Sequence, residues 1–138
     1  MNYLLDTCLL SEFIKRKPDQ KVLDWFDFQD DETLYISVLA IGEIHKGISK
    51  LVASRRKSEF QNWLEGVVER FESRILVFDV STSFVWGKLK SGLEAKGRNI
   101  PVIDSLMAAT ALEYDLTVVT RNESDYTATG VSLINPWI

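Results

Sequence analysis

The sequence predicts a single α/β domain, a three-layer α/β/α sandwich with a central parallel β-sheet of four to five strands. Short apolar segments alternate along the chain with longer segments whose apolar residues recur every three or four positions. Because a parallel connection between strands needs a covering helix, this alternation favours a parallel sheet with helices on both faces. The chain shows no repeat and no linker, so we assign residues 1–138 to one domain.

The first strand is expected at Tyr3–Leu5, an apolar run too short for a helix. Asp6 ends this run with a side chain that favours helix caps and turns. A short helix around residues 9–14 and a second one opened by Pro18 are expected next. We expect the acidic run at 30–32 to form a solvated loop.

The middle of the chain predicts one strand followed by two amphipathic helices. Residues 34–36 are apolar, and Ser37 after them is a good N-cap. Apolar residues then recur at helical spacing as far as Val52, and again between Ser54 and Phe71. We expect these two helices to pack as an antiparallel pair.

The last part of the chain predicts three more strands, at residues 75–78, 116–119 and 131–134. A helix is expected from about Thr82 to Gly97, because glycine commonly stops a helix. Another helix is expected after Pro101 and runs through Asp104. Strands and helices therefore alternate to the end of the chain.

Charge and composition exclude several classes of protein. Sixteen Lys and Arg face twenty Asp and Glu, for a net charge of −4, so no generally cationic surface indicates a nucleic-acid partner. The single Cys8 cannot form an internal disulfide. No apolar run approaches the roughly 18 residues of a membrane span, and the N-terminus does not resemble a signal peptide. We expect a cytoplasmic protein with no membrane partner.

Four acidic residues lie near the edge at which the parallel strands are expected to end: Asp6, Glu43, Asp104 and Asp125. Open parallel sheets bind their ligands at this edge. Converging carboxylates repel one another, and a hard divalent cation such as Mg²⁺ or Mn²⁺ relieves the repulsion. Such a site can hydrolyse a phosphodiester bond by activating a bound water.

Each of these acids also has a plainer interpretation. Asp6 could cap the following helix, and Asp104 could interact with a helix N-terminus. Asp125 could be a turn former, and Glu43 could lie on a solvated helix face. Two glycines flank Glu43, however, and a helix that keeps them predicts a close approach by another helix or by a substrate.

Other catalytic classes have little support in the chain. The lone His45 and Glu43 point to different faces of one helix, so we interpret His45 as a surface or packed residue. We interpret Cys8 as a small buried residue and not as a nucleophile. A phospho-receiver domain needs a pair of adjacent acids after the first strand. A phosphatase of the haloacid dehalogenase type needs an Asp where Cys8 stands.

Four segments in order resemble PIN-domain ribonucleases, namely residues 4–7, 37–44, 100–109 and 119–126, and the resemblance extends to the ending at 130–137. Within that family the chain is similar to VapC-type toxins of bacterial toxin–antitoxin modules, close to the FitB subgroup. The resemblance covers essentially the whole chain. It implies a PIN domain-like fold and a metal-dependent endoribonuclease with a four-acid pocket for Mg²⁺ or Mn²⁺.

Carried over by position, the resemblance assigns the three first acids of the pocket to Asp6, Glu43 and Asp104. The fourth position falls either on Asn122, where many relatives have Asp, or on Asp125. Thr7 matches a supporting hydroxyl position beside Asp6, and Cys8 replaces the Asn often found there. Without the four acidic residues, the sixteen remaining acids equal the sixteen Lys and Arg, so the pocket alone accounts for the net charge.

The resemblance also implies partners. These are RNA, for which a loop of tRNA is a plausible site, a cognate antitoxin of the VapB or FitA type, and a second copy of the chain in a homodimer. The candidate contacts to RNA phosphates are Lys46, Lys50, Arg98 and Arg121. The alternative function is a catalytically silent PIN scaffold that binds RNA or protein, for which Asn122 is the main argument.

Overall fold

The computed structural model describes all residues from 1 to 138. It has five short strands, β1 (Tyr3–Leu5), β2 (Leu34–Ser37), β3 (Ile75–Leu76), β4 (Thr117–Val119) and β5 (Leu133–Ile134). Its seven α-helices are α1 (Thr7–Glu12), α2 (Gln20–Phe28), α3 (Val38–Ser49), α4 (Arg55–Arg70), α5 (Val80–Ala95), α6 (Val102–Tyr114) and α7 (Glu123–Tyr126). None of the helices combines the length and the apolar surface that crossing a bilayer requires.

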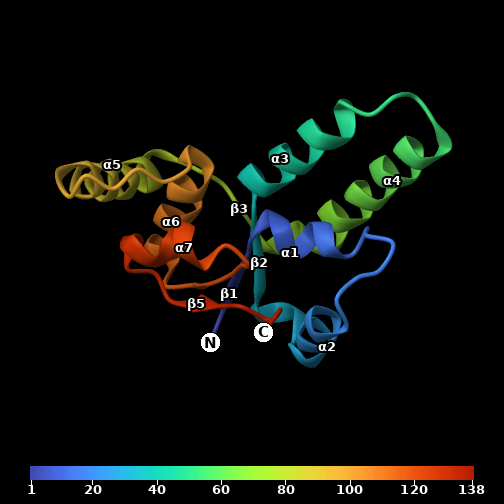
Figure 1. Cartoon of the computed structure of the whole chain (residues 1–138), viewed down its shortest axis with the longest axis horizontal. Helices are drawn as coiled ribbons and strands as arrows, with labels where there is room; N and C mark the ends of the chain where they lie inside the picture. Colours follow the sequence, from blue (N-terminus) through green and yellow to red (C-terminus); the bar gives the residue numbers. More distant parts are fainter.

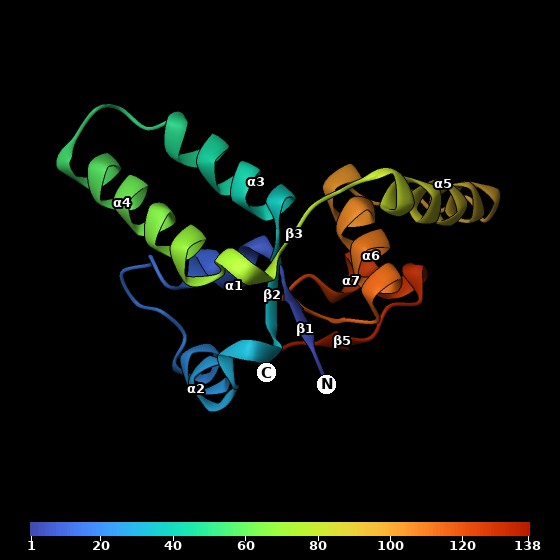
Figure 2. The same ribbon diagram turned by 180° about the vertical axis from the view of Figure 1, so that it is seen from behind.

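The five strands form one parallel sheet in the order β3-β2-β1-β4-β5. Helices α1 to α4 lie on one side of it and α5 to α7 on the other (Figures 1 and 2). The predicted three-layer α/β/α sandwich is therefore confirmed. The strand order reverses between β1 and β4, so the carboxyl ends of these two strands mark the point at which such sheets bind ligands.

The core consists of the three central strands and the helices that cover them. Leu4 and Leu5 of β1 and Val118 and Val119 of β4 are fully buried. Helix α6 packs closely against them, because three buried alanines on it leave little bulk between helix and sheet. This tight packing holds the first turn of α6, which contains Asp104, near the ends of β1 and β4.

The predicted antiparallel pair of helices is confirmed by α3 and α4, which project together from the sheet (Figures 1 and 2). The predicted stop of α5 is also confirmed. Gly97 has a φ of 67°, which is the left-handed conformation that glycine adopts readily, and its N–H donates to the carbonyl of Glu94. Lys96 is the C-cap, one residue before this glycine.

Several elements differ from the prediction. Strands β3 and β5 have two residues each, where strands at residues 75–78 and 131–134 were expected, and β4 begins at Thr117 and not at residue 116. Helix α1 begins at Thr7 and not near residue 9, because the Asp6 carboxylate accepts the Thr7 N–H and caps it. Helix α5 begins at Val80, before the expected start at Thr82, since Asp79 and Thr82 form a capping box. The acidic loop at 30–32 contains one exposed turn of 3-10 helix.

Candidate active site

Asp6 lies at the carboxyl end of β1, where the strand order reverses. Its side chain accepts the backbone N–H of Thr7 and the hydroxyl of Thr120, both at 2.8 Å. Burial raises the pKa of this carboxyl above its usual value, and the hydrogen bonds from Thr120, Thr7, Tyr126 and Cys8 oppose that rise. The plainer interpretation of Asp6 as a helix cap is thus confirmed by the geometry, and the second carboxylate oxygen is held in place by Thr120.

Asp104 interacts with the other three predicted acids. It lies in the first turn of α6, half-buried, and the hydroxyl of Tyr126 donates to its Oδ1 at 3.5 Å. Burial, followed by the charges of Asp6, Asp125 and Glu43, raises the pKa of Asp104 to about 7. The four acids are therefore close enough to interact, and we call this group the acidic pocket.

Glu43 reaches the acidic pocket from α3, where it is half-buried. Together with Thr7 it lines a cavity of about 240 Å³ between α1 and α3. The Oγ1 of Thr7 is buried there and has no hydrogen-bond partner. We predicted that another helix or a substrate approaches closely at Gly42 and Gly47. The prediction is wrong for a helix, because a Cβ added at either glycine meets no atom within 4 Å. The space beside these glycines is open.

The two candidates for the fourth acidic position, Asp125 and Asn122, have different surroundings in the structure. Asp125, in the first turn of α7, lies close enough to Asp104 to contribute to the raised pKa of that carboxyl. Asn122 is exposed, and its backbone N–H donates to the hydroxyl of Thr120 at 3.0 Å. The alternative interpretation of Asp125 as a turn former does not describe this segment, because residues 123–126 form the short helix α7.

Two buried residues of the site have no role in the sequence-based prediction. Thr120 is fully buried and links the Asp6 carboxylate to the loop after β4. Tyr126 is fully buried, and burial next to Asp6 and Asp104 raises the pKa of its hydroxyl, which therefore stays a hydrogen-bond donor. Both residues lie in the segment 119–126, one of those that resemble the family. This resemblance was the one signal in the sequence that could have identified them as site residues.

Cys8 is half-buried beside the acidic pocket. Its Sγ lies 3.8 Å from Oδ2 of Asp6 and accepts the backbone N–H of Arg121 at 3.4 Å. Burial, followed by the charge of Asp6, raises the pKa of this thiol. A protonated thiol is a poor nucleophile, which agrees with the interpretation of Cys8 as a packing residue.

The donor atoms of the acidic pocket are of the chemical type that a hard divalent cation prefers. Its four carboxylates and the unpartnered Thr7 hydroxyl are all oxygen ligands, which Mg²⁺ and Mn²⁺ prefer. No Lys or Arg forms an ion pair with any of the four acids. The side chains are not drawn together into a compact cluster of three or more potential metal ligands. The pocket thus offers uncompensated negative charge to a cation.

The four candidate RNA contacts are all exposed and have no carboxylate within 4.0 Å: Lys46, Lys50, Arg98 and Arg121. Lys46 and Lys50 lie at the far end of α3, and Arg98 follows α5. Arg121 differs from the other three because it directly follows Thr120, the residue whose hydroxyl donates to Asp6.

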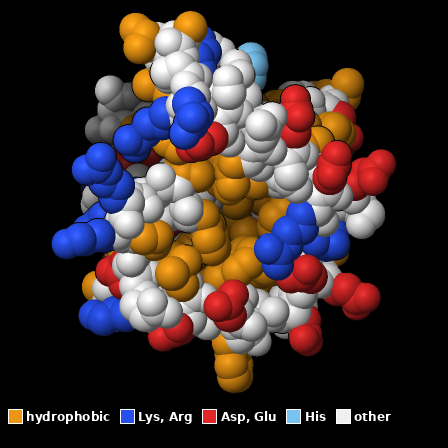
Figure 3. Space-filling view, turned by 90° about the vertical axis from the view of Figure 1, so that its right-hand side faces the viewer, with side chains coloured by type: hydrophobic (Ala, Val, Ile, Leu, Met, Phe, Trp, Pro, Cys, Tyr) orange, Lys and Arg blue, Asp and Glu red, His pale blue; other side chains and the backbone are white.

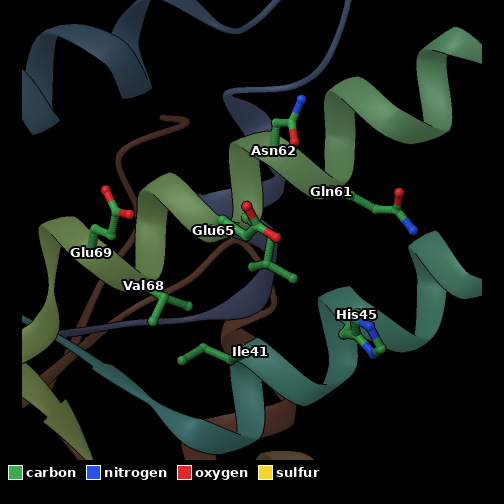
Figure 4. A pocket seen from close by; sticks show the side chains of 8 residues that line it. Ile41, His45, Gln61, Asn62, Glu65, Val68 and Glu69 are labelled. Carbon is green, nitrogen blue, oxygen red and sulfur yellow. The ribbon is translucent and has the colours of Figure 1, made fainter.

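The largest groove of the molecule, about 660 Å³, lies elsewhere, between α3 and α4. Figure 4 shows His45 and Ile41 of α3 facing Gln61, Glu65 and other side chains of α4. None of the predicted site residues lines it. His45 is exposed there, as predicted for a surface residue, and it lies in a different groove from Glu43.

A second feature is an apolar depression on the side formed by α1, α2 and α4 (Figure 3). Its lining comes mainly from aromatic and aliphatic side chains of these helices: Leu10, Phe13, Phe26, Trp63, Val67 and Phe71. Arg70 lies at its edge, where its guanidinium stacks on Phe26 at 5.0 Å. We call this surface the apolar hollow.

Fold and site together define an α/β domain with an acidic pocket at the switch point of a parallel sheet. A family model described as PIN domain matches residues 3–129. The chain is 38% identical over 135 residues to a protein named VapC ribonuclease Y4jK from Sinorhizobium fredii, covering 97% of this chain and 96% of the relative. This chain belongs to the PIN domain family.

Two solved structures agree with that assignment. A crystal structure of FitAcB from Neisseria gonorrhoeae superposes with a TM-score of 0.93 at 32% identity, covering 98% of each chain. VapBC2 from Rickettsia felis, bound to a DNA fragment from its promoter, superposes with a TM-score of 0.83 at 28% identity, covering 98% of each chain. The family predicted from the sequence is therefore confirmed.

Proposed function

We propose that this protein is a metal-dependent endoribonuclease toxin that a cognate antitoxin neutralises. The ribonuclease activity is supported by the VapC ribonuclease that resembles the chain over nearly its whole length. The observation that carries the metal dependence is the approach of four carboxylates at the switch point of the sheet, with no Lys or Arg paired to any of them. Burial and the neighbouring carboxylates both raise the pKa of Asp104, and a divalent cation relieves such repulsion. In this proposal the protein acts on RNA in the cytoplasm.

In this mechanism Asp6, Glu43 and Asp104 would hold Mg²⁺ or Mn²⁺, with Asp125 as the fourth acid. A cation held there would supply charge neutralisation at the scissile phosphate and a water of lowered pKa. Thr120 and Tyr126 hold the Asp6 and Asp104 side chains in position through their hydroxyl groups. The Thr7 hydroxyl is free to hold a water or a ligand atom, and the Asn122 amide has a supporting role.

The substrate in this proposal is an RNA whose phosphates meet the exposed cations. Lys46, Lys50, Arg98 and Arg121 would contact phosphates and therefore add affinity without sequence specificity. An unstacked loop, such as one of tRNA, is the type of RNA that proteins most often recognise in this way.

Removing the metal is expected to abolish cleavage of total cellular RNA by the purified protein. Activity should be lost in EDTA and return with excess Mg²⁺ or Mn²⁺, because the acidic pocket supplies no positive charge of its own. RNA fragment length on denaturing gels measures this. Cleavage that persists in EDTA would contradict the metal dependence. Metal-dependent RNA binding without cleavage would favour the silent PIN scaffold.

The antitoxin partner is supported by the similarity to FitAcB and VapBC2, which are toxin–antitoxin complexes. We propose that the apolar hollow receives it. A partly exposed Trp63 and Phe13 among buried side chains offer the aromatic anchors that dominate protein interfaces. The homodimer remains a prediction, which light scattering of the purified chain can measure.

Replacing Trp63 by alanine is expected to weaken antitoxin binding by about 30-fold, the effect of removing one aromatic anchor. RNA cleavage by the free toxin should stay within about twofold of wild type, because Trp63 lies outside the acidic pocket. Calorimetry with the antitoxin encoded beside the toxin measures the affinity. Phe84→Ala is the matched control, since this exposed aromatic lies on α5 on the other side of the sheet. Equal losses in both variants would contradict this docking site.

A further inference from the structure

A buried carboxylate outside the acidic pocket holds the end of the chain. Glu12, at the end of α1, is 2% exposed and accepts the indole N–H of Trp137 at 3.2 Å. It also accepts the backbone N–H of Asp19 at 2.8 Å and pairs with Lys15 at 2.9 Å. A buried carboxylate with three donors is fully satisfied, so this contact fixes Trp137 against α1. Trp137 is therefore held in a fixed place against α1.

A cationic side chain, that of Arg121, lies against the indole of Trp137. The guanidinium of Arg121 lies over the ring of Trp137 with its carbon 5.8 Å from the ring centroid, within the range of a cation–π contact. Arg121 is exposed and forms no ion pair, unlike Arg70, which pairs with Asp31. Stacking restricts the rotamers of a long side chain and leaves its N–H groups free for another ligand.

The backbone of the same arginine is attached to the acidic pocket. Its N–H donates to Sγ of Cys8, and the preceding residue, Thr120, donates its hydroxyl to Asp6. Cys8 and Glu12 are one turn apart on α1. Arg121 thus links the pocket, at one end of α1, to the fixed indole at the other.

We propose that Arg121 binds an RNA phosphate beside the acidic pocket and that Trp137, held by Glu12, is a positioning residue for it. An acidic pocket repels RNA, so the substrate needs a cation close to the acids that those acids do not neutralise. A guanidinium stacked in one place loses less entropy on binding a phosphate than a freely rotating side chain does. This inference rests on the ribonuclease function proposed above.

The test compares the KM and kcat of RNA cleavage in Arg121→Ala, Trp137→Leu and the double variant. Arg121→Ala is expected to raise KM by about tenfold, the effect of one charge-assisted contact, with kcat nearly unchanged. Trp137→Leu is expected to raise KM about threefold in the wild-type background and to have no further effect in the Arg121→Ala background. A residue that acts through Arg121 has this dependence, whereas a merely structural role would give the same loss in both backgrounds.

Two further measurements separate positioning from stability. Trp137→Phe keeps a ring under the guanidinium but loses the bond to Glu12, so it should lower Tm and raise KM by less than Trp137→Leu does. In EDTA, binding of a labelled single-stranded RNA by Arg121→Ala should lose about 0.7 from the slope of log Kd against log salt. Lys21→Ala, an exposed position on α2 at the opposite end of the sheet, is the control and should match wild type in KM.

The possible results distinguish this inference from the proposed function. Wild-type protein that shows no metal-dependent cleavage would contradict the ribonuclease function itself. Wild-type cleavage together with an unchanged KM in Arg121→Ala would overturn the inference alone. A Trp137→Leu effect of the same size in both backgrounds would overturn the positioning role of Trp137.

Discussion

Replacing Asp104 by asparagine is expected to lower RNA cleavage by about 100-fold or more and, at the same time, to stabilise the metal-free protein. The loss of activity follows from removing one of the acids that holds the cation. The gain in stability follows from the pKa of this carboxyl, which burial and the charges of Asp6, Asp125 and Glu43 raise from 3.8 to about 7. The asparagine keeps the shape of the side chain without its charge.

The direction of the pH dependence follows from the same shift. Between about pH 4 and pH 7 the folded protein holds a proton on Asp104 that the unfolded chain has already released. The free energy of unfolding in EDTA therefore falls as the pH rises through this window, and the loss is complete above pH 7. The Asp104→Asn variant lacks this loss, so its Tm should exceed that of wild type at pH 8 and approach it near pH 4.

Differential scanning calorimetry in EDTA, with and without added Mg²⁺, measures this effect. Mg²⁺ should raise the Tm of wild type more than that of Asp104→Asn, because binding to the folded state alone stabilises it. Asp27→Asn, an exposed position on α2, is the matched control and should change neither cleavage nor the response to Mg²⁺. A lower Tm of Asp104→Asn in EDTA at pH 8 would contradict the repulsion.

Replacing Thr120 by valine is expected to have the second largest effect. The hydroxyl of Thr120 is fully buried, donates to Asp6 at 2.8 Å and accepts the N–H of Asn122 at 3.0 Å. Valine has the same shape but leaves the buried carboxylate without this donor, which should cost about 1–3 kcal/mol of stability. Since Asp6 then loses its fixed orientation, Mg²⁺ affinity should fall by about 10–100-fold.

Thr110→Val supplies the control for this prediction. Thr110 is also buried, but its hydroxyl donates to the carbonyl of Leu106 within α6 and touches none of the four acids. Its replacement should change stability without changing Mg²⁺ affinity, as measured by calorimetric titration. If both variants lost Mg²⁺ affinity equally, the effect would come from general loosening of the fold and not from Asp6.

Most of the fold could be predicted from the sequence because the apolar patterns that indicate strands and helices each lie within one short segment of the chain. The apolar runs of β1, β2 and β4 and the helical spacing in α3 and α4 each lie within one segment. The errors fell where a single side chain moved a boundary, as Asp6 did at α1, or where an element was short. Helix α7 has four residues, too few for a periodic pattern, and no helix was predicted there.

The sequence identified the four acids by their residue types and positions. It did not predict the burial and the hydrogen-bond donors that surround them. Asp6, Glu43, Asp104 and Asp125 come from four segments, and only the arrangement of strands and helices in the fold brings them close enough to interact. Thr120 and Tyr126 were missed as site residues because a hydroxyl inside a short apolar or helical segment looks like any other packing residue.

By itself, the sequence determined the α/β class, the family and the set of acids, since these depend on residue type, spacing and order along the chain. The tertiary structure alone decided how strongly the acids interact, which donors hold them, and that the indole of Trp137 lies under Arg121. The physical reason is distance: burial and Coulomb repulsion depend on separations of a few ångström between residues more than 100 positions apart, such as Asp6 and Thr120.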